Sequence, residues 1–203
     1  MKKLVCSLAA LFAFGMANAQ ETTTSEGFKQ GDAFISGSAG LSSQKTGDLK
    51  SNTFNVSPRV GYFVTNNIAL GVSLGYSHQS QDYRDATVDY ERKISTVTAG
   101  VFGRYYLMPA SKFSVFGQLG VNYASSKSKI ERFDSEDKYN TFDVAIAPGI
   151  NYFISDHFAL EATFGLLSYN TSKPDVNYDT DSTDTFNFGL NLSDINFGLI
   201  YKF

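Results

Sequence analysis

The end of the chain alternates strictly between two kinds of side chain. Every second residue back from the C-terminus is apolar, and these residues are Phe203, Tyr201, Leu199, Phe197 and Ile195. The residues between them are mostly small or polar. Because successive side chains of a strand point to opposite faces, this pattern predicts a β-strand with one apolar face that runs to the last residue. Soluble domains rarely end on such a strand, so the predicted fold must account for an apolar strand face at the C-terminus.

The same alternation recurs through the chain. Apolar or small uncharged side chains occupy every second position of seven further segments, which are 33–41, 54–62, 68–76, 97–107, 113–123, 142–152 and 158–166. The opposite faces are rich in Ser, Thr, Asn and Gly and hold the few charges. A charge facing lipid at mid-depth costs roughly 2–4 kcal/mol. An uncharged apolar face on every strand therefore predicts that this face points outward into lipid.

The connections between these segments alternate in length. Three are short, at 65–67, 108–112 and 155–157, and four are longer and polar, at 44–51, 78–93, 125–139 and 170–184. Short turns at one end and longer loops at the other are typical of transmembrane barrels. The predicted fold is all-β: an up-and-down, eight-stranded antiparallel transmembrane barrel. Pro58 and Pro148 fall inside predicted strands, so we expect a bulge or an unpaired carbonyl beside each.

The N-terminus has the features of an export signal. Lys2 and Lys3 precede an apolar run over 4–16, which is too short to span a bilayer as an anchor, and Ala17-Asn18-Ala19 forms a small-x-small cleavage site. The predicted organisation is a signal peptide at 1–19, a flexible polar leader at 20–31 and the barrel domain at 32–203. Cys6, the single cysteine, lies in the signal, so disulfide and thiol chemistry are not expected in the mature chain. The net charge of −3 argues against a nucleic-acid partner.

Several motifs resemble a known family. They are the Pro58-to-Phe63 strand end Pro-x-x-Gly-Tyr-Phe, the restart Asn-x-Ile-Ala-Leu-Gly at Asn66 to Gly71, its echo at His157 to Leu160, and the terminal Phe203. They resemble the small eight-stranded outer-membrane barrels that include OmpX and the transmembrane domain of OmpA. The resemblance implies a Gram-negative outer-membrane location among lipopolysaccharide, and termini in the periplasm. It also implies recognition of the last strand, through Phe197, Leu199, Tyr201 and Phe203, by the barrel assembly machinery.

The face opposite the apolar one carries balanced charge. Three cations, Arg59, Arg104 and Lys202, share the predicted lumen with three anions, Asp143, Glu161 and Asp194. Buried charges need partners, so we expect an ion-pair network that plugs the barrel. Arg59, Arg104 and Glu161 are predicted to lie at similar depth. The alternative is a narrow porin-like channel, although selective pores more often present one sign of charge.

Catalysis and metal binding have weak signals. His78 lies beside Ser77 and Ser80, a faint echo of the His/Ser constellation of lipid A-modifying acyl hydrolases on this scaffold, but the sequence supplies no orienting carboxylate or oxyanion site. Acidic residues near 175–184, including Asp179 and Asp181, are a solvated loop or a weak site for Ca²⁺ or Mg²⁺. No enzyme activity, cofactor or metal is predicted.

The predicted loops carry apolar residues that can mark a partner surface. These residues are Tyr83, Tyr90, Ile130 and Phe133. The preferred functional hypothesis is therefore a non-enzymatic structural anchor that displays loops for interaction or adhesion, with an extracellular or host surface partner. The channel is the second hypothesis and the lipid A acyl hydrolase or transferase the third.

Overall fold

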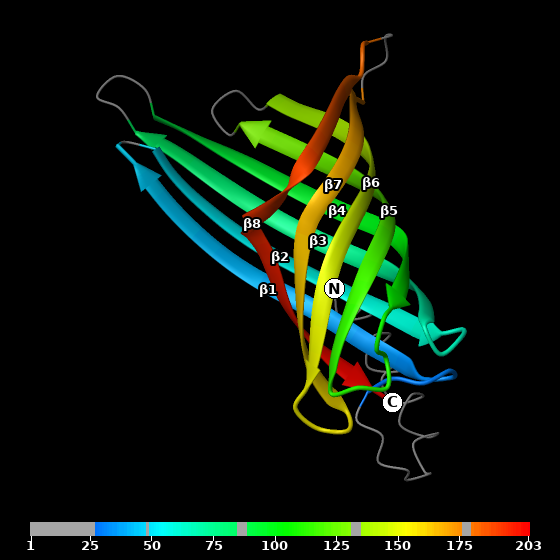
Figure 1. The fold of residues 1–203 in the computed structure, drawn as a ribbon. Coiled ribbons are helices and arrows are strands. Elements are labelled where there is room, and N and C mark those ends of the chain that lie inside the picture. Colours follow the sequence, from blue (N-terminus) through cyan, green and yellow to red (C-terminus); the bar gives the residue numbers. More distant parts are fainter. Residues whose placement is uncertain (1–26, 48, 85–88, 131–134, 176–179) are drawn as a thin grey trace, which may run out of the picture.

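The computed structural model describes residues 27–47, 49–84, 89–130, 135–175 and 180–203 (Figure 1). These residues form eight strands: β1 (Ala33–Thr46), β2 (Leu49–Phe63), β3 (Ile68–Arg84), β4 (Asp89–Tyr106), β5 (Phe113–Ile130), β6 (Ser135–Phe153), β7 (Phe158–Pro174) and β8 (Thr183–Lys202). The part of the chain that is described holds no helix with the length and apolar character of a membrane span.

Each strand pairs antiparallel with its neighbours in the sequence, and β1 pairs with β8 to close a barrel. The fold predicted from the alternation is confirmed. The short connections and both ends of the barrel chain lie at one end of the barrel, which we call the turn end. The β1–β2, β3–β4, β5–β6 and β7–β8 connections lie at the other end, which we call the hairpin end. Figure 1 shows the strands converging near the C-terminus and spreading toward the hairpin end.

The two faces of the sheet differ as the alternation predicts. Large apolar side chains on the outer face are exposed, among them Val72 and Val101, each at 55%. The lumen at the turn end is instead filled by aromatic rings with almost no exposure, including Phe34, Phe63 and Phe116. The lumenal face was expected to be small and polar, so the rings are a feature that the alternation did not predict.

The strands are longer than predicted. Most of the segment 78–93, expected to be a loop, belongs to β3 and β4, and most of 125–139 belongs to β5 and β6. The loop bounds were wrong because strands that rise above lipid are wet on both faces, so apolar alternation no longer marks them. A membrane-spanning strand needs only about 9–11 residues, so strands of 17 to 20 residues such as β3 and β8 extend well beyond a bilayer.

Both internal prolines disturb the sheet. The β6–β7 register shifts between Ile146 and Gly149, which flank Pro148, so the predicted bulge is confirmed there. Beside Pro58, β2 pairs with β3 at Val56 and again at Arg59, with an unchanged register across the gap. The register shift places one extra residue in β7 and so changes which residues of that strand form its outer face. Leu167, and not Leu166 as predicted, stands opposite Ile146.

Residues 27–31 are packed against the turn end. The Phe28 amide donates a hydrogen bond to the Pro109 carbonyl at 2.7 Å, and the Gly31 amide donates to the Phe63 carbonyl at 2.9 Å. The Phe28 side chain is completely buried. The expectation of a flexible leader is therefore wrong for these residues, because the Phe28 ring within the polar segment packs among the rings of Phe34, Phe63, Tyr106 and Phe153.

Candidate functional site in the lumen

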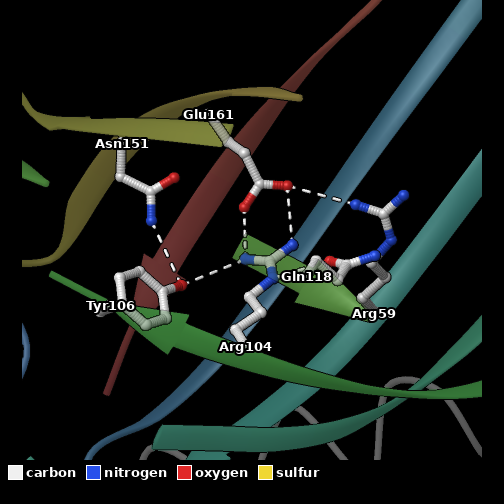
Figure 2. A network of polar contacts seen from close by, with 6 residues as sticks. All are labelled: Arg59, Arg104, Tyr106, Gln118, Asn151 and Glu161. Carbon is white, nitrogen blue, oxygen red and sulfur yellow. Dashed lines mark hydrogen bonds and ion pairs between the residues drawn. The ribbon is translucent and has the colours of Figure 1, made fainter. Parts of the chain in front are cut away.

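An ion pair crosses the lumen between β4 and β7 (Figure 2). The Arg104 guanidinium donates two hydrogen bonds to the Glu161 carboxylate, from Nη1 at 2.5 Å and from Nη2 at 3.1 Å. Both residues are buried. Two parallel bonds between charged groups fix the relative orientation of the partners as well as attracting them. The pair therefore ties together two strands that are not neighbours in the sheet.

Arg59 on β2 reaches the same carboxylate. Its Nη1 lies 3.2 Å from Glu161 Oε1, and its side chain keeps 21% of its exposure. The structure thus brings together Arg59, Arg104 and Glu161. The resulting cluster holds two guanidinium groups and one carboxylate.

Neutral side chains complete the coordination of Arg104 (Figure 2). Its Nε donates to Gln118 Oε1 on β5 at 2.8 Å, and Nη1 lies 3.2 Å from the Tyr106 hydroxyl. The Asn151 amide donates to the same hydroxyl at 3.4 Å. Together these six residues, on β2, β4, β5, β6 and β7, span the lumen with polar contacts. We call them the lumenal network: Arg59, Arg104, Tyr106, Gln118, Asn151 and Glu161.

Aromatic rings close the lumen between this network and the turn end. Phe28 packs on Phe63 with ring centroids 4.6 Å apart and on Phe153 at 4.9 Å. The Arg104 guanidinium lies over the Phe116 ring, 4.4 Å from its centroid, which adds a cation–π contact to the ion pair. The network and the rings together form a plug across the turn-end half of the barrel.

The remaining lumenal charges predicted from the sequence lie elsewhere. Asp143 accepts a hydrogen bond from Asn122 Nδ2 at 3.1 Å, nearer the hairpin end. Lys202 is buried at the turn end, where Nζ donates to the Gly27 carbonyl at 2.6 Å. Asp143 and Lys202 therefore lie apart from the cluster of Arg59, Arg104 and Glu161. The side chain of Asp194 lies outside the described residues.

A cavity that we call the vestibule occupies the lumen on the hairpin-end side of the plug. This cavity of about 430 Å³ is lined largely by amide and hydroxyl side chains, including Asn55, Ser57, Asn122 and Asn170. Arg59 and Gln118 belong both to the vestibule wall and to the lumenal network. The vestibule therefore ends on the plug.

The histidine singled out by the sequence has a serine partner that was not foreseen. His78 Nδ1 lies 2.9 Å from Ser95 Oγ, directly across the β3–β4 ladder, whereas Ser80 donates to Glu91 at 3.0 Å. Within the contacts of the described residues, no carboxylate orients the His78 ring. The described ranges also contain no group of three or more His, Cys, Asp or Glu side chains placed to hold a metal ion.

The residues proposed as a loop surface lie near the hairpin end. Tyr83 and Tyr90 are register partners near the end of the β3–β4 ladder, and Ile130 pairs with Ser135, so these are strand residues. Asp181 is exposed before β8. Phe133, Asp179 and the Tyr83 side chain lie outside the described residues.

Aromatic rings gather around Tyr201 at the turn end, on the outer face. The Tyr201 ring lies 5.0 Å from that of Phe203 and 5.1 Å from that of Phe158. Phe197 and Leu199 are exposed. An aromatic girdle at the edge of an apolar belt is typical of the membrane interface.

These features together define an integral membrane β-barrel: a closed antiparallel sheet, an apolar outer face, an aromatic girdle and a polar, charge-paired lumen. The chain belongs to the outer membrane protein beta-barrel domain family, whose model matches residues 6–193. Its location is the outer membrane of a Gram-negative cell. No curated protein matches the sequence.

Solved structures of outer-membrane barrels share the fold. OprG from Pseudomonas aeruginosa is 18% identical, with a TM-score of 0.56 over 88% of this chain and 98% of that one. The N-terminal barrel of OprF from the same organism is 15% identical, with a TM-score of 0.50 over 87% and 100% of the two chains. OmpW from E. coli is 15% identical, with a TM-score of 0.50 over 86% and 99%. At these identities the likeness concerns the fold alone.

Proposed function

We propose that the protein is a non-enzymatic, non-conducting anchor in the outer membrane that displays its hairpin end to an extracellular partner. The observation that carries this proposal is the plug. Arg104 and Glu161 bond across the lumen, and Phe28 packs among the rings beneath them. An ion passing through would have to break a buried ion pair and displace a packed ring.

The long strands supply the display surface. In this proposal the chain termini lie in the periplasm and the hairpin end rises beyond lipopolysaccharide. β3 to β6 extend through 17 to 19 residues, well past the 9–11 or so that lipid requires. The paired ends of these strands, with Tyr90 and Ile130, are the part offered to a partner such as a host surface.

The second candidate is a narrow channel, and the vestibule is the observation that favours it. A cavity of about 430 Å³ already lies on the hairpin-end side of the plug and reaches Arg59. If the Arg59–Glu161 and Arg104–Glu161 contacts opened, the aromatic rings would still have to move before the vestibule reached the turn end.

Conductance separates the two candidates. The mature chain is refolded in detergent, its folding is checked by heat-shifted gel mobility, and single-channel current is recorded in a planar bilayer. A folded but silent barrel supports the anchor. Steady conductance that changes in Arg59→Gln or Glu161→Gln would overturn the anchor and establish the channel.

A further inference from the structure

The barrel is closed along only part of its height. The pairs between β1 and β8 run from Phe34↔Lys202 to Gly37↔Leu199, whereas β1 pairs with β2 along its whole length, up to Thr46↔Leu49. Figure 1 shows β1 and β8 diverging above this short ladder. We call the two edges beyond it the open seam: residues 38–46 of β1 and residues 183–198 of β8.

The seam begins inside the depth of the membrane. The ladder spans four residues of β1, and at about 3.3 Å per residue it covers roughly 13 Å of strand. The apolar band of an outer-membrane barrel is about 25 Å tall. The unpaired backbone groups of the seam therefore start within lipid, where a strand edge without hydrogen-bond partners is strongly unfavourable.

Four large apolar side chains along the seam also have unusually high exposure. Among the described residues, the large apolar side chains with the highest exposure are Leu41 at 86%, Phe188 at 74%, Phe197 at 72% and Phe186 at 64%. All belong to β1 or β8. These four side chains therefore lack the cover that a second neighbouring strand gives elsewhere in the barrel.

A bulge explains why β8 does not return to β1. On β8, Ile195 pairs with Phe164 of β7, and the next pair is Asn191 with Gly165, so residues 192–194 have no place in the β7–β8 ladder. Extra residues in one strand bend it and increase its twist. The bulge lies just beyond the last β1–β8 pairs and directs the rest of β8 along β7, away from β1.

We propose that the open seam is an interface for a second copy of this chain, which adds β1 of one barrel to β8 of the other. A two-fold axis perpendicular to the membrane places β1 of each copy opposite β8 of its partner. Rotation about that axis leaves the up or down direction of every strand unchanged, so the new pairs are antiparallel as in the closed ladder. Each copy then satisfies both edges of the other.

Charge at the hairpin end favours this pairing over pairing of like edges. Lys45 and Lys50 are exposed register partners at the end of the β1–β2 ladder. Asp181 and Asp184 are exposed at the start of β8, and Asp175 is exposed just after β7. Two β1 edges would bring lysines together, whereas β1 against a partner's β8 brings lysines to aspartates.

Cross-linking between single-cysteine chains tests the proposal. Gln44→Cys on β1 and Asn187→Cys on β8 occupy strands at the seam, near the hairpin end. Two differently tagged mature chains, which lack the predicted signal peptide and with it Cys6, are refolded together in phosphatidylcholine vesicles and treated with a flexible bismaleimide, with heat-shifted mobility as the check on folding. The proposal requires a Q44C–N187C dimer, little Q44C–Q44C or N187C–N187C dimer, and none from Ser125→Cys on β5, which lies away from the seam.

Other occupants of the seam give other results. A chain carrying both Q44C and N187C that cross-links within itself would mean that the barrel zips closed alone. Folded chains that give no Q44C–N187C product would mean that lipid or another molecule covers the edges. Equal yields for every cysteine combination, S125C included, would mean random collision. Each of these results overturns the proposal.

Charge reversal provides a second readout. Lys45→Glu with Lys50→Glu should abolish the Q44C–N187C product when the partner chain is otherwise unchanged. Asp181→Lys with Asp184→Lys in that partner should restore it. If neither pair of substitutions changed the yield of the Q44C–N187C product, the assignment of the partner as a second copy would be overturned, because the choice of that partner rests on this charge complementarity.

Discussion

Arg104 and Glu161 are separated by 57 positions in the sequence and bonded twice across the lumen, at 2.5 and 3.1 Å. Glu161 is the shared partner, since it also contacts Arg59 at 3.2 Å. The arrangement makes the three residues unequal. Loss of Arg104 leaves Glu161 a second cation, whereas loss of Glu161 leaves two guanidinium groups close together without the carboxylate that they share.

Removal of Glu161 should therefore cost more stability than removal of Arg104. Breaking a buried ion pair from one side typically costs about 3–5 kcal/mol, so we expect Glu161→Met to reach that range and Arg104→Met to fall below it. The measurement is the free energy of unfolding in urea, with the barrel in lipid vesicles. Replacing both residues with Met should recover much of the loss, because no pair is left half-broken. An Arg104→Met variant less stable than Glu161→Met would contradict this reading of the network.

Phe28 should contribute to stability as a core residue does. It is fully buried and its ring contacts those of Phe34, Phe63, Tyr106 and Phe153. Truncation of a buried Phe to Ala typically costs about 3–5 kcal/mol, so Phe28→Ala should lower the unfolding free energy by an amount of that order. The exposed neighbour Lys29 supplies the control, since Lys29→Ala should change little. Equal stability of the two variants would mean that residues 27–31 do not seal the barrel in solution.

Much of the fold could be predicted because lipid imposes a simple rule. The outer face of each strand must be apolar and uncharged, so a period of two in the sequence located the strands at the turn end and the short connections such as 65–67 and 155–157. At the hairpin end this rule no longer applies. Water reaches both faces there, and the sequence alone could not separate strand from loop in segments such as 78–93.

The aromatic half of the plug was missed although the sequence carries a signal for it. Three strand ends show aromatic doublets, which are Tyr62-Phe63, Tyr105-Tyr106 and Tyr152-Phe153. Neighbouring residues of a strand face opposite sides, so one ring of each doublet must enter the lumen. In the structure the second ring of each is buried and the first is exposed. The position of Phe28 had no such signal, because no periodicity marks the segment that carries it.

Close packing of the plug should make substitution of Gly149 costly. A Cβ at Gly149 would lie 2.3 Å from the Phe116 ring, whereas a Cβ at Gly117, on the neighbouring strand, would meet nothing within 4 Å. Overpacking a filled core typically costs about 1–3 kcal/mol. We expect Gly149→Ala to lose stability within that range in urea unfolding and Gly117→Ala to lose much less. Similar values for both would show that the Phe116 ring moves aside freely.

The terminal aromatic should matter for assembly more than for the stability of the finished barrel. Phe203 lies at the outer edge of the turn end, where its ring contacts Tyr201 and its amide donates to the Ala33 carbonyl at 3.0 Å. Substitution by Ala keeps the backbone bond and removes only a half-exposed ring, so spontaneous refolding of Phe203→Ala in detergent should resemble that of the unaltered chain. In cells, the proposed recognition of the last strand by the barrel assembly machinery predicts a marked loss of the heat-modifiable, folded form from outer-membrane fractions.

Phe113→Ala is the matched control for this prediction, because it removes a partly exposed ring at the same end of the barrel, at the start of β5. If the ring of Phe203 served only to anchor the barrel at the membrane interface, the two substitutions would lower the folded fraction in cells equally. A loss confined to Phe203→Ala, with refolding in detergent unchanged, separates recognition from anchoring, since the assembly machinery acts only in the cell.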